Sequence, residues 1–279
     1  MSDPRRSDAR SQRAREQWDA LAGWWKETFT EGADPEYALE IFPVAKATLR
    51  GCARVLDVGC GEGQVARHLA QHQREGGWVI GIDPSANQLA TARARGGGVR
   101  YVQAAGEALP FARASFNGVC CCLAIEHADE VDQVLAEIAR VLEVGGRFLL
   151  LVNHPLYQGP GSGLVDDRIL DEVYWRVGPY LREQRAPEEV DPGVEVLFAH
   201  RPLSRYVNPL ARADLLLVEM LEPPPRRELL SGSPDPDLEA AIPRLLALVF
   251  EHRPRPSSRG RASGAPARAR RRGAPPPER

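Results

Sequence analysis

Short, continuous apolar runs alternate along this chain with segments whose apolar residues recur every three or four positions. The runs are rich in Val, Ile, Leu and Cys, which is typical of parallel strands buried on both faces. They lie at 53–59, 78–83, 99–104, 117–124 and 147–154. The segments between them have helical spacing, as in "EVDQVLAEIARVLE". Five strands joined by helices predict an α/β fold with a doubly wound, Rossmann-like parallel sheet.

The pattern changes after the fifth run. Residues 155–200 carry scattered aromatics between Gly and Pro, which predicts a long insertion that caps a binding site. Alternation then resumes with a predicted helix at 202–213, a strand at 214–223 and a final strand near 242–252. At the front, Trp18, Leu21, Trp25 and Phe29 form one stripe of an amphipathic helix. Such a helix either packs on the core or forms a lid over a ligand.

Composition and charge set the domain boundaries. The 279 residues are 43% hydrophobic and 27% charged, which is typical of a soluble globular protein. No stretch reaches the ~18 apolar residues of a membrane helix, and no secretory signal is visible. We therefore expect a cytoplasmic protein without a membrane contact. We expect a flexible N-terminus at 1–14, one domain at 15–252 and a disordered tail at 253–279.

The predicted tail is strongly basic. It contains nine arginines against one glutamate and no aromatic residue. A weak contact with nucleic-acid phosphates is compatible with that charge, but no side chain there could stack on bases. We do not expect nucleic acid to be the partner, and the oligomeric state stays open. The five cysteines suit neither a disulfide framework nor a zinc site, so we expect no metal.

The stretch "VLDVGCGEGQ", residues 55–64, places three glycines directly after the first predicted strand. Glycines at such a turn let the backbone approach a ligand closely. The spacing departs from the G-x-G-x-x-G of dinucleotide folds, and no P-loop lysine follows. Asp57, just before the turn, suits a positively charged group better than a pyrophosphate. Asp83, at the end of the second strand, is placed to accept hydrogen bonds from both hydroxyls of a ribose.

A ribose with a cationic group and no phosphate describes S-adenosylmethionine. The segments "VLDVGCGEGQVARHLA", "VIGIDPSANQLATAR", "ALPFARASFNGVCCCLAIEH" and "EIARVLEVGGRFLLLVNHP" resemble, in order and spacing, the motifs of class I S-adenosylmethionine-dependent methyltransferases. The resemblance is to the UbiE-like and type 11 enzymes, and within them to a bacterial subgroup without an assigned substrate. It implies a seven-stranded sheet whose last strand is antiparallel.

The resemblance also implies roles for particular residues. Asp57 and the turn Gly59, Cys60 and Gly61 would hold the methionine part, and Asp83 the ribose. The adenine side would be formed by Pro84, Gly106, Glu107 and Leu123. The family usually has an aspartate where this chain has Ala105, and a lost hydrogen bond there costs about 1 kcal/mol of cofactor affinity. Asn117 replaces another common aspartate at a turn.

Methyl transfer depends mainly on aligning the acceptor with the methyl group, and a base is needed only when the acceptor must lose a proton. His154 and His127, which follow the fifth and fourth strands, are the candidate catalytic residues. For each, a purely structural hydrogen bond is the alternative. We expect the acceptor to contact Trp25, Asn153, Tyr157, Tyr174, Tyr180 and His200.

Aromatic residues around a concave site favour a small, partly apolar acceptor. Two other functions stay open. One is a non-catalytic member of the fold that binds S-adenosylmethionine or a partner protein. The other is an NAD-dependent oxidoreductase.

Overall fold

The computed structural model describes residues 4–29, 35–230 and 232–253. Helix α1 spans Pro4–Phe29, so it takes in residues 4–14, which we expected to be flexible. The helix thus begins eleven residues before the predicted start at Arg15. The predicted tail lies outside the described residues from position 254 onward.

A seven-stranded sheet forms the centre of the molecule, in the order β10-β11-β5-β4-β1-β2-β3. Its strands are β1 (Arg54–Val58), β2 (Trp78–Asp83), β3 (Arg100–Gln103), β4 (Phe116–Cys122), β5 (Leu142–Asn153), β10 (Leu215–Leu221) and β11 (Leu245–His252). Strands β1 to β5 pair in parallel, whereas β11 runs antiparallel to both β5 and β10. This topology confirms the predicted fold, including the reversed last strand.

Helices cover both faces of the sheet because its strands are apolar on both sides. In β5, Phe148, Leu150 and Val152 belong to the core under α5 and α6, whereas Leu149 and Leu151 pack into the core under α2 and α3. The helical elements after α1 are η1 (Tyr37–Ile41), α2 (Phe42–Thr48), α3 (Gln64–Ala70), α4 (Ala86–Ala94), η2 (Ile125–His127), α5 (Val131–Val141), α6 (Ser204–Arg212), η3 (Arg227–Leu230) and α7 (Pro236–Ala240). The predicted alternation of strand and helix is confirmed.

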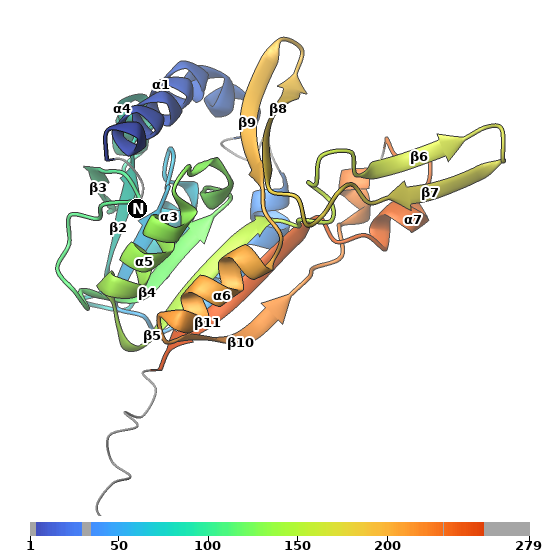
Figure 1. Ribbon diagram of the computed structural model, residues 1–279. Coiled ribbons are helices and arrows are strands. Elements are labelled where there is room, and N and C mark those ends of the chain that lie inside the picture. The colour runs from blue at the N-terminus through green and yellow to red at the C-terminus, as the bar shows by residue number, and fades with distance from the viewer. Residues whose placement is uncertain (1–3, 30–34, 231, 254–279) are drawn as a thin grey trace, which may run out of the picture.

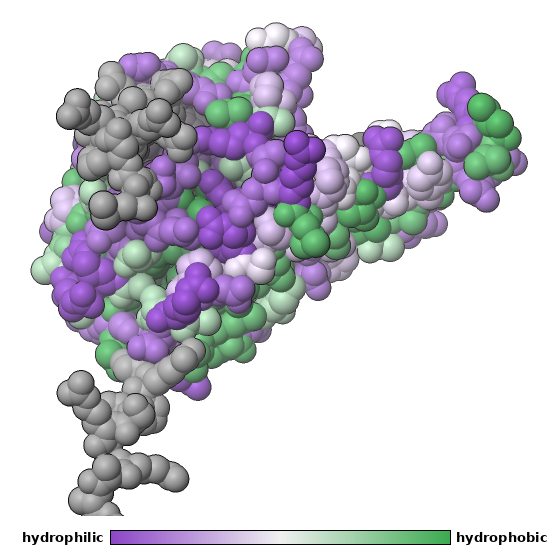
Figure 2. Space-filling model, in the orientation of Figure 1, coloured by the Kyte–Doolittle hydropathy of each residue, from purple (hydrophilic) through white to green (hydrophobic). Residues whose placement is uncertain are grey.

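The insertion after β5 is more regular than the sequence indicated. It consists of two antiparallel hairpins, β6 (Gly163–Asp167) with β7 (Glu172–Arg176), and β8 (Gln184–Asp191) with β9 (Val194–His200). The first hairpin projects away from the sheet, and the second stands beside α1 (Figure 1). Apolar side chains are exposed at the end of the projecting hairpin, where Ile169 is 94% and Leu170 63% exposed (Figure 2).

None of the helices in the described part of the chain is both long and apolar enough to cross a membrane.

Candidate active site

The turn after β1 forms the floor of a cavity at the carboxyl ends of the parallel strands. Gly59, Gly61 and Gly63 all have positive φ, at 72°, 52° and 84°. Two features exclude a side chain at Gly59. Its positive φ disfavours any residue with a Cβ, and a Cβ there would lie 2.4 Å from the Cβ of Ala124. The glycine spacing that the sequence shows is therefore required by a tight turn that packs against the end of β4.

The cavity has a volume of about 140 Å³. Its wall comes from α1, from the turn after β1, from the ends of β2 and β4 and from the loop after β3. It is lined by Trp18, Trp25, Tyr37, Asp57, Val58, Gly59, Cys60, Gly61, Glu62, Gln64, Val65, Ile82, Asp83, Pro84, Gln88, Ala104, Ala105, Gly106, Glu107, Cys121, Cys122, Leu123, Ala124, Ile125, His127, Ala128, Asp129 and Val134. All nine residues that we predicted to bind the cofactor are among them.

Asp57 is a buried carboxylate without a full set of partners. One of its oxygens, Oδ1, accepts a weak hydrogen bond from Cys120 Sγ at 3.5 Å. The other, Oδ2, is buried and has no hydrogen-bond partner among the described residues. Burial raises the pKa of Asp57 to about 7, and the nearby Asp83 adds to this. A cation in the cavity would supply the missing partner and favour the ionised form.

Asp83 is fixed by two backbone donors. Gly61 N–H donates to its Oδ2 and Ser85 N–H to its Oδ1, each at 2.8 Å. Because a carboxylate has about four acceptor positions, both oxygens keep room for a ligand's hydroxyls. Burial raises the pKa of Asp83 to about 6, against the two backbone donors, which lower it. The residue is thus oriented by the same turn that forms the floor of the cavity.

Two loops complete the predicted adenine side. Gly106 and Glu107 lie after β3 and line the cavity beside Ala105, which offers no side-chain acceptor. Leu123 lies at the end of β4 with a positive φ of 52°, a conformation that costs energy for a residue with a Cβ. Its N–H is held by Leu151 O at 2.8 Å. This backbone conformation places Leu123 in the wall of the cavity.

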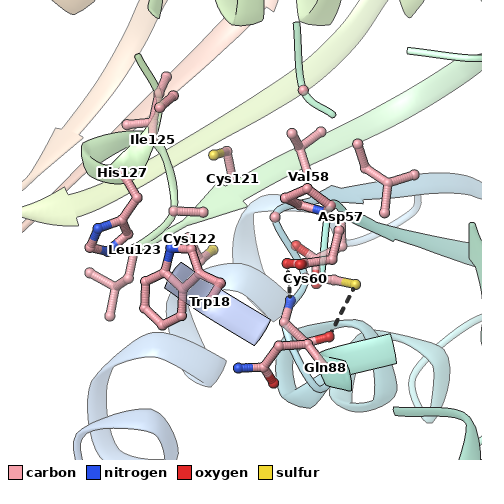
Figure 3. A pocket seen from close by; sticks show the side chains of 18 of the residues that line it. Trp18, Asp57, Val58, Cys60, Gln88, Cys121, Cys122, Leu123, Ile125 and His127 are labelled. Atoms are coloured by element: carbon pink, nitrogen blue, oxygen red, sulfur yellow. Dashed lines mark hydrogen bonds between the residues drawn. The ribbon is translucent and has the colours of Figure 1, made fainter. Parts of the chain in front are cut away.

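His127 is the histidine that the structure brings to the cavity. Its Nδ1 donates to Leu197 O at 3.1 Å, so Nε2 of the neutral ring carries a free electron pair. The ring contacts Trp18 edge-on at 4.8 Å between centroids and Phe198 at 4.7 Å. Figure 3 shows Trp18, Leu123 and His127 together at one end of the cavity and Asp57 and Cys60 at the other. Burial lowers the pKa of His127 to about 4, and nearby Arg185 and Arg201 lower it further, against the hydrogen bond to Leu197.

His154 does not line this cavity. The ring is buried at 5% exposure and both of its nitrogens are engaged within the chain. Asn153 does not line this cavity either, and its backbone N–H donates to Glu126 Oε1 at 2.8 Å. The catalytic role of His154 stays a prediction, and these contacts favour the structural alternative.

The tyrosines of the insertion also lie elsewhere. Tyr157 stacks on Trp175 at 5.0 Å and donates a hydrogen bond to Glu239. Tyr174 is 42% exposed on the projecting hairpin. The segments that carry Tyr180 and His200 contact each other, because His200 Nε2 donates a hydrogen bond to Tyr180 O at 2.8 Å. These four residues lie outside the cavity, so their contact with an acceptor stays a prediction. Of the predicted acceptor contacts, the cavity is lined by Trp25.

The structure adds detail to the predicted lid helix and brings in one residue, Arg201, that the sequence reasoning missed. Trp18 belongs to the same helical stripe as Trp25, so this stripe was the available signal. Arg201 is buried and donates to the carbonyls of Ile125 and Ala128, which fixes the loop bearing His127. No sequence motif marks Arg201, because its partners are backbone atoms 73 and 76 residues away.

These features fit S-adenosylmethionine, the cofactor that the sequence predicts. An unpartnered buried carboxylate, Asp57, suits the ammonium of its methionine part. The ribose hydroxyls suit Asp83, and the glycine turn lets the backbone approach a ligand in the cavity closely. Acids predominate among the ionisable residues of the wall, which favours a cationic ligand over a pyrophosphate.

Comparisons with known proteins agree with this assignment. A family model described as a methyltransferase domain matches residues 56–150. The chain is 32% identical over 178 residues to the ubiquinone/menaquinone biosynthesis C-methyltransferase UbiE of Desulfotalea psychrophila, which covers 62% of this chain and 69% of that protein. It is also 39% identical over 103 residues to a malonyl-[acyl-carrier protein] O-methyltransferase of Enterobacter lignolyticus, over 37% of this chain and 40% of the relative. A match to another relative, UbiE of Hahella chejuensis, spans 47% of that protein's length.

Among solved structures, an S-adenosylmethionine-dependent methyltransferase from Mesorhizobium loti aligns with a TM-score of 0.62 and 27% identity, over 75% of this chain and 96% of its own. One from Listeria monocytogenes aligns with a TM-score of 0.61 and 26% identity, over 72% and 90%. The sheet order, the cavity and these similarities lead to one conclusion. This chain belongs to the class I S-adenosylmethionine-dependent methyltransferase family, whose cofactor is S-adenosylmethionine.

Proposed function

We propose that this protein transfers a methyl group from S-adenosylmethionine to a small, partly apolar acceptor. The observation that carries the proposal is the pair of buried carboxylates around one glycine turn, Asp57 with an unpartnered oxygen and Asp83 held by Gly61. That arrangement suits a ligand with an ammonium group and a ribose. When bound, the cofactor supplies an electrophilic methyl group on a sulfonium.

The acceptor site belongs at the end of the same cavity where α1 meets the loop after β4. Trp18 and Trp25 supply a large apolar surface there, with their rings 5.5 Å apart. His127 is the ionisable ring among them. Such a wall, mostly aromatic with one ionisable ring, is typical of sites for small organic molecules. Relatives named for ubiquinone/menaquinone biosynthesis and for malonyl-[acyl-carrier protein] indicate that acceptors differ within the family.

His127 supplies the acid–base chemistry that this site allows. Its Nδ1–H is held by Leu197 O, which leaves Nε2 to accept a hydrogen bond from an acceptor O–H or N–H. Burial keeps the ring neutral at pH 7, so Nε2 can hold or take that proton while the acceptor atom gains its methyl group. Because a ring with a low pKa is a weak base, its main role is to orient the acceptor.

Two measurements test the proposal. Isothermal titration calorimetry should show binding of S-adenosylmethionine and S-adenosylhomocysteine and no binding of NAD, whereas NAD binding alone would favour an oxidoreductase. Fractionated metabolite pools should then be incubated with S-adenosylmethionine labelled in its methyl group. Label in a low-mass product, lost in Asp57→Asn, supports the proposal. Label only in protein or nucleic acid would refute the small acceptor, and cofactor binding without turnover in any pool would favour a non-catalytic binding protein.

A further inference from the structure

Helix α1 is attached to helix α4 through one aspartate. Asp19 Oδ1 accepts hydrogen bonds from Ser85 Oγ and from Asn87 N, the latter at 3.2 Å. The backbone carbonyl of Asp19 accepts a third, from Asn87 Nδ2 at 3.0 Å. Figure 1 shows α1 lying across the end of α4 where these contacts form. The first turn of α4 therefore holds α1 at a defined position along its length.

Ser85 extends this contact to the cofactor site. It is the N-cap of α4, fully buried, and its Oγ also accepts a hydrogen bond from Gln88 N at 3.1 Å. Its own N–H donates to Asp83 Oδ1 at 2.8 Å. Asp19 on the helix and Asp83 in the cavity are thus joined through a single serine. A shift of Asp19 moves a residue that orients Asp83.

The neighbours of Asp19 form part of the cavity wall. Trp18 precedes it and contacts His127, and Trp25 lies two turns further along the same helix. Because these indoles close the cavity on the α1 side, a movement of α1 away from α4 opens the site. Between them, Trp24 Nε1 donates to Asp191 Oδ2 at 2.9 Å, an exposed contact with the β8–β9 hairpin.

The polar contacts of Asp19 and Trp24 differ in strength. The contact with α4 comprises three hydrogen bonds around a half-buried carboxylate at a helix N-terminus, where negative charge is favoured. The hydrogen bond from Trp24 to the hairpin is exposed, so it competes with water. The contact of Asp19 with α4 is therefore a strong polar attachment of α1.

We propose that Asp19 is a positioning residue that latches α1 closed over the cavity and, through Ser85, couples closure of this lid to a ligand held by Asp83. The ligand's identity rests on the proposed function, whereas the latch itself can be observed in the ligand-free protein. When the ligand binds, Asp83 and Ser85 become more firmly fixed, and Asp19 gains a more rigid partner. When Asp19 is released, the tryptophans leave the wall and the ligand escapes faster.

The test compares Asp19→Ala, Asp19→Asn and the control Glu27→Ala, an exposed position on the same helix. Hydrogen–deuterium exchange of residues 16–28 in the ligand-free protein measures opening of α1. Stopped-flow tryptophan fluorescence measures the dissociation rate of S-adenosylhomocysteine. Asp19→Ala should increase both about tenfold, since it removes charge-assisted hydrogen bonds. Asp19→Asn should lie between it and the native protein, because the amide oxygen still accepts from Ser85 and Asn87. Glu27→Ala should change neither.

Equal exchange and equal dissociation in Asp19→Ala and Glu27→Ala would overturn the latch. Alanine favours the helix more than aspartate does, so faster exchange in Asp19→Ala would reflect a lost attachment rather than a weaker helix. Should Asp19→Ala fold poorly, Asp19→Asn replaces it, because this change removes the charge from the hydrogen bonds of Asp19 with Ser85 and Asn87. Faster exchange of 16–28 in that variant supports the latch, and unchanged exchange refutes it. If S-adenosylhomocysteine does not bind the native protein, the proposed function fails, while the exchange experiment still decides on the latch.

Discussion

His154 Nε2 donates a hydrogen bond to Glu222 Oε1 at 2.9 Å, while His154 Nδ1 accepts one from Leu156 N at 3.1 Å. The ring therefore connects the end of β5 to the residue that follows β10. The backbone N–H of His154 donates a further hydrogen bond, to Arg244 O at 2.7 Å. Both ring nitrogens are engaged and the ring is buried, so these contacts favour a structural role for His154 over the predicted catalytic one.

We predict that His154→Ala lowers the free energy of unfolding by about 2 kcal/mol, because a buried ring and two hydrogen bonds are lost. Chemical denaturation measures this change. The dissociation constant for S-adenosylmethionine and the turnover per folded molecule should stay near the native values. A turnover loss of a hundredfold or more in the folded variant would instead restore a catalytic role for His154.

Asp57 makes cofactor affinity depend on pH. Burial raises its pKa to about 7 in the free protein, and a cationic ligand binds the carboxylate form. Affinity for S-adenosylmethionine should therefore rise as the pH increases from 5 to 7.5, by up to tenfold per pH unit below the pKa. Calorimetry across this range, in buffers of different ionisation enthalpy, would also show proton release on binding.

The control for this prediction is Asp57→Asn, in which the change of cofactor affinity around pH 7 should disappear. A smaller change of affinity around pH 6 should remain in this variant. The reason is that Asp83, with a pKa of about 6, also binds the ligand as an ionised carboxylate. An affinity that is independent of pH in the native protein would contradict a direct contact between Asp57 and a cationic group.

Asp83 and Asn117 allow a matched comparison. Asp83→Ala removes the proposed acceptor of both ribose hydroxyls and also releases Gly61 N and Ser85 N. We expect it to weaken cofactor binding by at least a hundredfold, since hydrogen bonds to a charged group contribute about 1.5–3 kcal/mol each. Asn117 Oδ1 accepts from Arg54 N at 2.9 Å, at the opposite end of β1. Asn117→Ala should lower the melting temperature and leave the dissociation constant unchanged. Equal dissociation constants for the two variants would refute the ribose assignment.

The fold and the cofactor side of the site could be predicted from the sequence because their signals are local. The apolar runs mark strands such as β5, whose alternate residues serve two cores. Asp57 and Asp83 each end a strand, and parallel strands bring such ends to one edge of the sheet. The glycines were identified by their spacing, and their positive φ values explain it.

The acceptor side could not be predicted in the same way. Glycines and prolines in residues 155–200 suggested irregular loops, but Gly161, Gly163 and Gly193 lie beside or within two hairpins instead. Pairing between strands such as β8 and β9 depends on contacts that no local spacing reveals. The choice between His127 and His154 likewise depended on which side of the strand ends each ring faces. That was decided by Leu197 O and Glu222, both distant in sequence.

His127→Asn tests the remaining catalytic candidate. The variant should lower turnover by about 10²–10⁴ if the acceptor must lose a proton, and by less if His127 only orients it. The dissociation constant for S-adenosylmethionine should change little, because Asp57 and Asp83 lie at the other end of the cavity. His72→Asn, an exposed position at the end of α3, is the matched control and should keep full turnover. Since burial lowers the pKa of His127 to about 4, turnover at saturating cofactor should show no fall between pH 8 and 5.5. A loss centred near pH 6.5 in the native protein, absent from His127→Asn, would show that the ring is charged in that range and would contradict its burial against Trp18 and Phe198.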